Sequence, residues 1–184
     1  MKLRALLALV LGTLVPMVAL AQTERLLKPE EINEKALVEL LAPEETGAPA
    51  KRRTRSINVT REESAQPAAK PAAASLLITF ETNSAGLTPA GKQSLDVVGR
   101  ALSSEKLSSY RFAIEGHSDP RGGEAYNMRL SQSRAESVVG YLAENHQIER
   151  GRLTPVGKGP TQLLNPARPE APENRRVTIK RLDN

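Results

Sequence analysis

The chain has 184 residues, enough for one or two domains, and it carries 26 Lys plus Arg against 21 Asp plus Glu, a formal net charge of +5. That excess of positive charge is too small to indicate a nucleic-acid groove. The absence of Cys argues against disulfide scaffolds, thiolate metal sites, cysteine nucleophiles and a cysteine-linked lipid anchor. With only two His in the chain, no metal site and no cofactor are expected.

The N-terminus reads as a secretory signal. Lys2 and Arg4 precede an uncharged, largely apolar run from Ala5 to Leu20, which ends in the small-x-small sequence Ala19-Leu20-Ala21. The run contains Gly12 and Pro16 and falls short of the ~20 residues that span a bilayer. We therefore predict a signal peptide over 1–21, no transmembrane segment in the mature chain, and a periplasmic location in association with the outer membrane or the cell wall.

Residues 22–75 are rich in Ala and Pro, contain no aromatic residue and balance basic with acidic side chains. This composition predicts a flexible tether. Within it, Pro29 can begin a helix, and Ile32, Ala36 and Leu40 follow at helical spacing, which predicts a short helix over 29–41. That helix either packs on its own domain or recruits an outer-membrane protein partner. The basic run Lys51-Arg52-Arg53-Thr54-Arg55 is either a solvated charge cluster or a contact for an anionic lipid or polymer.

All five aromatic residues lie within 76–184, which we predict to be the folded domain. Apolar residues alternate with others over 76–81 and 110–115, which predicts two strands. Thr88 and Pro89 form a cap and first-turn pair that begins a helix ending near Ser104. A second helix ends near Asn145, and shorter strands are expected over 153–156 and 176–181.

The order β-α-β-α-β-β predicts an α+β fold, a two-layer sandwich in which two helices cover one face of a mixed four-stranded sheet. The proline-rich stretch 158–173, between the last two strands, is long enough to be either a functional loop or an insertion.

Polar residues gather where the second strand gives way to the second helix. Gly116-His117-Ser118-Asp119 follows the strand directly, and a loop at a strand end is well placed to meet a ligand. Asn127 and Arg134 are two helical turns apart and share one flank. If the helix start lies against the loop, Asp119 and Arg134 offer opposite charges to one pocket. Without further context, the pattern favours Asp119 as a cap of the turn or of the helix start, and Arg134 as an ordinary surface residue.

These residues belong to a longer pattern. Gly116-His117-Ser118-Asp119, Tyr126-Asn127, Leu130-Ser131, Arg134-Ala135, Tyr141-Leu142 and Asn174-Arg175-Arg176-Val177 occur in the order seen in the OmpA-like C-terminal domain, which the segment from Leu76 to Asp183 resembles. The resemblance implies the fold of that family. It also implies non-covalent binding of peptidoglycan through the diaminopimelate residue of its stem peptide, and no enzymatic activity. The N-terminal β-barrel of outer-membrane protein A has no counterpart in the sequence.

The resemblance implies that Asp119 and Arg134 bind the diaminopimelate residue. The side chain of diaminopimelate ends in an ammonium and a carboxylate on one carbon. Asp119 can accept a hydrogen bond from the ammonium, and Arg134 can donate two parallel hydrogen bonds to the carboxylate. Asn127 can orient either group. Arg175 or Arg176 adds a contact, and strand alternation would let only one of them face the pocket.

The sequence departs from the family pattern at two places. Pro120 follows the key Asp and stiffens the loop, and Glu170-Ala171 stands where a Gly-Arg pair is common. Two alternatives to wall binding remain open at this stage. One is an envelope interaction module that no longer binds the wall, and the other is a hydrolase using His117 with Asp119.

Overall fold

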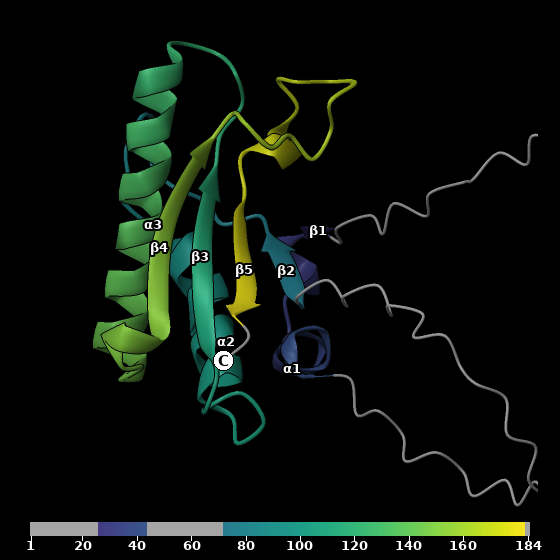
Figure 1. Cartoon of the computed structure of the whole chain (residues 1–184), viewed down its shortest axis with the longest axis vertical. Helices are drawn as coiled ribbons and strands as arrows, with labels where there is room; N and C mark the ends of the chain where they lie inside the picture. Colours follow the sequence, from purple (N-terminus) through teal and green to yellow (C-terminus); the bar gives the residue numbers. More distant parts are fainter. Residues whose placement is uncertain (1–25, 44–71, 183–184) are drawn as a thin grey trace, which may run out of the picture.

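The computed structural model describes residues 26–43 and 72–182. Five strands form one mixed sheet in the order β1-β2-β5-β3-β4 (Figure 1). The strands are β1 (Leu26–Leu27), β2 (Ala73–Leu76), β3 (Arg111–His117), β4 (Leu153–Gly159) and β5 (Val177–Leu182). The helices are α1 (Glu34–Leu41), α2 (Pro89–Ser103) and α3 (Glu124–His146), with short 3-10 turns η1 (Pro29–Glu31), η2 (Arg150–Arg152) and η3 (Pro172–Asn174).

The predicted α+β fold with a mixed sheet is confirmed. From β2 onward the elements follow the predicted order, and α2 and α3 cover one face of the sheet (Figure 1). Strand β5 is antiparallel to both β2 and β3, whereas β4 is parallel to β3. The prediction of four strands missed β1, which adds a fifth strand parallel to β2 at the sheet edge.

Local signals explain where α2 begins. The side-chain oxygen of Thr88 accepts a 3.0 Å hydrogen bond from the backbone N–H of Gly91, and Pro89 occupies the first turn. The helix then buries Leu95, Val98 and Leu102 completely. Burial of this stripe against the sheet is what holds the helix in place.

The first predicted strand is displaced. Strand β2 ends at Leu76, whereas the strand was expected over 76–81. The alternating burial that motivated the prediction is real, since Leu76 and Ile78 are buried and Thr79 is exposed. Residues beyond Leu76 nevertheless lie outside β2, because its partner β5 begins only at Val177, which pairs with Leu76.

Part of the predicted tether is folded onto the domain. Helix α1 begins after Asn33, whose side chain accepts a hydrogen bond from the backbone N–H of Ala36. Residues 29–31 form a separate 3-10 turn, so the helical phase shifts, and Leu37 and Leu41 are completely buried in place of the expected Ala36 and Leu40. These leucines join the same hydrophobic core as α2 and the sheet. Of the two roles considered for this helix, packing on its own domain is the one observed.

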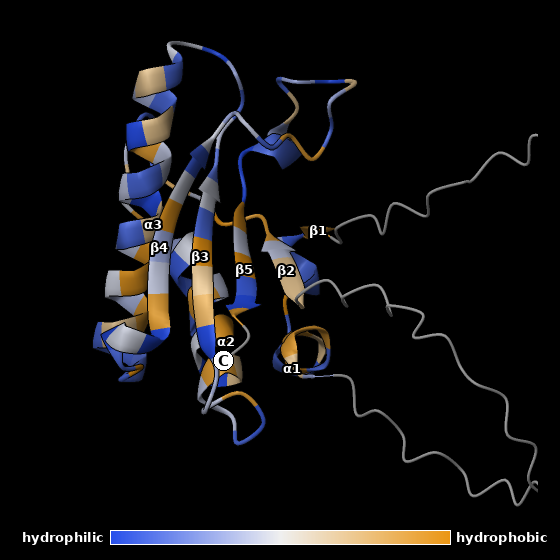
Figure 2. Ribbon diagram, viewed as in Figure 1, coloured by the Kyte–Doolittle hydropathy of each residue, from blue (hydrophilic) through white to orange (hydrophobic). Residues whose placement is uncertain are grey.

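Figure 2 shows hydrophobic residues along the middle of the sheet, and mainly hydrophilic residues at the end where β3 and β4 stop. Helix α3 approaches that end closely. A β-carbon on Gly116 would collide with the carbonyl oxygen of Ser131, and one on Gly157 would lie 2.7 Å from the backbone nitrogen of Gln132. Glycine at these two positions therefore lets α3 lie directly on β3 and β4.

Within the part of the chain that the structure describes, no helix is both long and apolar enough to cross a membrane. The predicted signal peptide, the basic run 51–55 and the remainder of the tether between α1 and β2 lie outside the described residues.

Candidate functional site

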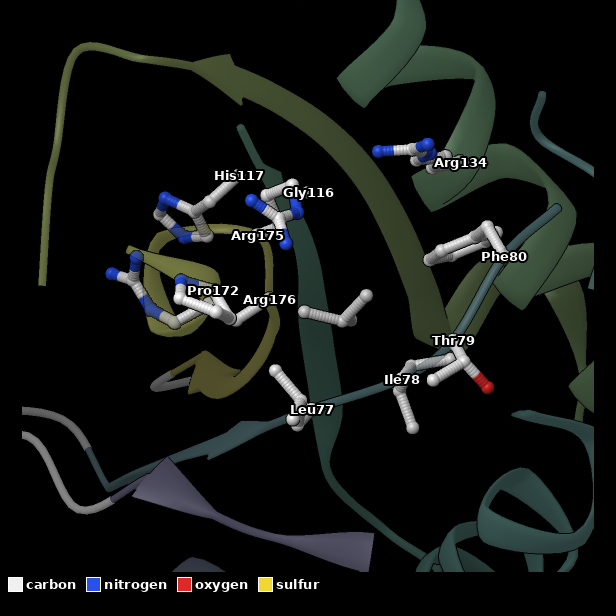
Figure 3. Close-up of a pocket in the computed structure, with 11 residues that line it drawn as sticks. Leu77, Ile78, Thr79, Phe80, Gly116, His117, Arg134, Pro172, Arg175 and Arg176 are labelled. Atoms are coloured by element: carbon white, nitrogen blue, oxygen red, sulfur yellow. The ribbon is translucent and has the colours of Figure 1, made fainter. Parts of the chain in front are cut away.

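The polar end of the sheet holds a cavity of about 250 Å³ (Figure 3). Strands β2 and β3 end here and β5 begins here, so the loops that leave them surround one opening. The cavity is lined by Leu77, Ile78, Thr79, Phe80, Gly116, His117, Arg134, Pro172, Arg175, Arg176 and Val177. Its wall thus combines apolar side chains with three arginines.

Asp119 lies in the loop after β3 with only 7% of its side chain exposed. Its Oδ2 accepts hydrogen bonds from Nη2 of Arg121 at 2.8 Å and from Nη1 of Arg175 at 2.8 Å. Its Oδ1 accepts a bond from the backbone N–H of Arg121 at 3.1 Å. Burial alone would raise the pKa of Asp119, but the hydrogen bonds from Arg121 and Arg175 outweigh it and lower the pKa to about 2. Asp119 is therefore an anion at every physiological pH.

Asn127 is buried at the start of α3 and holds this loop. Its Nδ2 donates to the carbonyl oxygen of Arg121 at 2.8 Å and to that of Asp119 at 3.3 Å. The amide expected to orient a ligand thus uses its donor within the protein, where it fixes the backbone on both sides of Pro120.

Arg134 projects from α3 beside the cavity, with its guanidinium over the ring of Phe80 at 5.0 Å from the ring centre (Figure 3). Its Nε donates to the carbonyl oxygen of Ser84 at 3.0 Å. No described residue forms a hydrogen bond or ion pair with its two terminal nitrogens. Burial lowers the pKa of Arg134, and the positive charge of Arg175 lowers it further. This half-buried cation therefore has two terminal nitrogens, each with two N–H donors, left for a ligand.

Both Arg175 and Arg176 are among the residues that line the cavity, whereas only one of them was expected to face the pocket. Strand β5 begins at Val177, and both arginines precede it, so strand alternation does not apply to them. Arg175 spans the distance between Asp119 and the cavity. Arg176 is buried, with its Nε directed to Oγ of Ser75 and its Nη1 to the carbonyl oxygen of Gln162.

Asp119 and Arg134 lie in one electrostatic environment, because the negative charge of Asp119 favours the charged form of Arg134. Asp119 does not line the cavity itself. Arg175 contacts the Asp119 carboxylate and lines the cavity with Arg134, and it therefore links the predicted pair.

Three contributors to the site were not predicted as site residues. Phe80 lies within the strand pattern predicted over 76–81, and Arg121 stands two residues after Asp119 in the loop. Ser84 contributes through its backbone carbonyl, for which side-chain chemistry gives no signal. A hairpin places Ser84, since Phe80 and Leu87 form an antiparallel bridge around it.

The hydrolase alternative depends on His117 acting with Asp119. His117 is buried, and its Nε2 lies 3.9 Å from Oε2 of Glu115. Among residues 26–43 and 72–182, no three His, Cys, Asp or Glu side chains gather as a metal site would require.

Comparison with known proteins agrees with this architecture. The sequence model of the OmpA family matches residues 79–176. The chain is 39% identical over 82 residues to outer membrane protein A of Shimwellia blattae, an alignment that covers 45% of this chain and 34% of that protein. It is 34% identical over 109 residues to the peptidoglycan-associated lipoprotein of Pseudomonas aeruginosa, covering 55% of this chain and 60% of that protein. The chain therefore spans less than two thirds of the length of either relative.

Solved structures share the fold. The OmpA-like domain of FopA1 from Francisella tularensis aligns with a TM-score of 0.51 at 18% identity, over 60% of this chain and 75% of that one. The periplasmic domain of MotB from Helicobacter pylori aligns with a TM-score of 0.53 at 14% identity, over 65% of this chain and 80% of that one. The relatives confirm the expected location in the cell envelope, at the outer membrane or the cell wall. Since the family match covers more than half of the chain, this protein belongs to the OmpA family.

Proposed function

We propose that this protein binds peptidoglycan non-covalently in the periplasm through the diaminopimelate residue of the stem peptide, without catalysing a reaction. The observation that carries the proposal is the state of Arg134. Its guanidinium is half-buried, held on two sides by Ser84 and Phe80, and directed to a cavity with its terminal nitrogens unoccupied by any described residue.

A carboxylate is the ligand group that suits this arrangement. Two parallel N–H donors of a guanidinium match the two oxygens of a carboxylate, and a held guanidinium loses little side-chain entropy on binding. Because Nε already donates to Ser84, the ligand carboxylate has to approach the terminal pair Nη1 and Nη2 end-on.

The ammonium of the same diaminopimelate carbon requires an acceptor close by. Asp119 is ionised, and its position next to Arg175 brings a negative charge to the cavity rim. In the bound state Asp119 accepts from the ammonium and Arg134 binds the carboxylate. Arg175, which contacts Asp119 and lines the cavity, adds a second donor for that carboxylate. Asn127 contributes by holding the loop that carries Asp119.

A single small site of this kind binds weakly, and retention on the wall therefore depends on many stem peptides or on a second anchor. The apolar face of α1 packs on the domain. A contact with an outer-membrane protein partner, if residues 22–75 make one, therefore does not use Leu37 and Leu41.

The experiment is cosedimentation with peptidoglycan sacculi whose stems contain diaminopimelate. Asp119→Asn and Arg134→Gln each remove one charge with little change in size, and both should abolish cosedimentation while circular dichroism stays unchanged. Arg129→Gln, at an exposed position of α3, is the matched control and should sediment like the unmodified protein.

Full cosedimentation of both site variants would overturn the proposal and favour the interaction-module alternative. Release of muropeptides by the purified protein would instead favour a hydrolase.

A further inference from the structure

The Asp119 carboxylate is already occupied by a neighbour in the chain. Arg121 contacts it three times, through its backbone N–H to Oδ1 and through Nε and Nη2 to Oδ2. The Arg121 side chain is 56% exposed, whereas that of Asp119 is 7% exposed. A solvent-exposed guanidinium thus covers a buried carboxylate.

The hydrogen-bonding capacity of Oδ2 is used up. It accepts from Nε of Arg121 at 3.2 Å, from Nη2 of Arg121 at 2.8 Å and from Nη1 of Arg175 at 2.8 Å. A carboxylate oxygen offers about two lone-pair sites. A further cation can bind Oδ2 only if one guanidinium leaves, whereas Oδ1 accepts only the backbone N–H of Arg121. An ammonium that contacts both oxygens therefore also requires a guanidinium to leave Oδ2.

Arg121 is the one that can leave at low cost. Its side chain is more exposed than that of Arg175, which is 39% exposed. The loop also keeps its shape without it, because two contacts involve only the backbone of Arg121. These are its N–H to Oδ1 of Asp119 and its carbonyl oxygen, which accepts from Nδ2 of Asn127.

We propose that the Arg121 guanidinium occupies the position of the ligand ammonium and competes with it, so that Arg121 sets the affinity of the site for ligands that use Asp119. This inference rests on the proposed function. The inference also explains why three arginines line the cavity whereas the Asp119 carboxylate does not.

The size of the effect follows from the competition. When a site must open before it binds, the observed dissociation constant is the intrinsic one divided by the open fraction. Ion pairs with one partner exposed to solvent shift such equilibria by a factor of about two to five. Removing the Arg121 side chain should therefore tighten ligand binding by about two- to fivefold.

The test is isothermal titration calorimetry with two probes. The first is the tripeptide L-alanyl-γ-D-glutamyl-meso-diaminopimelate, and the second is the same tripeptide with its side-chain amine acetylated. Arg121→Ala should bind the first probe about two- to fivefold more tightly than the unmodified protein. The second probe has no ammonium for Asp119, so the substitution should leave its affinity unchanged.

Arg129→Ala removes the same charge from an exposed position on α3 and controls for net charge. It should not tighten binding of either probe.

Equal or weaker binding of the first probe by Arg121→Ala would overturn the inference while leaving the proposed function intact. So would an equal gain for the acetylated probe, because the effect would then not pass through Asp119. If neither the unmodified protein nor any variant binds either probe, the proposed function fails and the inference fails with it. Binding by Arg121→Ala alone would support both.

Discussion

The ionised Asp119 should stabilise the fold in a way that acid removes. Its pKa is about 2 in the folded protein, against an ordinary value of 3.8. A pKa that is lower in the folded state means that folding favours the ionised form, so this contribution is present above about pH 4 and is lost as the pH falls through 2. The difference between the two pKa values corresponds to about 2 kcal/mol, and because the side chain is 7% exposed, solvent screens this little.

The assay is urea unfolding of the unmodified protein and of Asp119→Asn from pH 7 to pH 2. Asparagine does not titrate in this range, so the difference between the two free energies of unfolding isolates the Asp119 carboxylate. We expect this difference to shrink by about 2 kcal/mol between pH 5 and pH 2. A difference that stays constant over that interval would refute the ion-pair account of the Asp119 loop.

Two further predictions concern packing away from the site. Gly99→Ala should lower the free energy of unfolding by about 1–3 kcal/mol, because the new β-carbon would collide with the ring of His146. Gly140→Ala is its control, because no described residue beyond its chain neighbours and the backbone of its own helix comes within 4 Å of that new β-carbon. This variant should be neutral or stabilising by up to about 1 kcal/mol in the same urea titration. Leu37→Ala should lower the free energy of unfolding by about 2–5 kcal/mol, since Leu37 is completely buried. Glu39 is exposed, so Glu39→Ala should have little effect, and a loss of that size for Glu39→Ala instead of Leu37→Ala would show that α1 packs through another face.

Elements with strong local signals could be predicted from the sequence. Helix α2 starts at the predicted Thr88-Pro89 pair and ends next to the predicted Ser104, and the residues that it buries, Leu95, Val98 and Leu102, stand at helical spacing. Strand β3 likewise buries the alternating Phe112 and Ile114. In each case the period of apolar residues carries the information.

Two elements were misplaced, for different reasons. Strand β2 includes Ala73, Ala74 and Ser75, whose small side chains show no alternation, and its end is set by the pairing of Leu76 with Val177. The phase of α1 was missed because the Asn33 cap separates it from the turn that begins at Pro29. Pairing register depends on tertiary contacts that a single sequence window does not contain. The cap, by contrast, is a local hydrogen bond from the backbone N–H of Ala36 to Asn33.

The same distinction holds for the site. Asp119 and Arg134 were predicted because their charges stand in a recognisable pattern at a strand end and on a helix flank. Arg121 matters because its guanidinium binds the Asp119 carboxylate, and Ser84 matters because its backbone carbonyl accepts from Arg134. Neither contact can be inferred from the sequence pattern, and both require the three-dimensional structure.

The most direct test of the central proposal is a crystal structure of the protein with L-alanyl-γ-D-glutamyl-meso-diaminopimelate bound. We expect the terminal carboxylate within hydrogen-bond distance of Nη1 and Nη2 of Arg134, with the ammonium of the same carbon on the Asp119 carboxylate and the Arg121 side chain displaced. A tripeptide bound elsewhere on the molecule, with Arg134 free of it, would contradict the proposal.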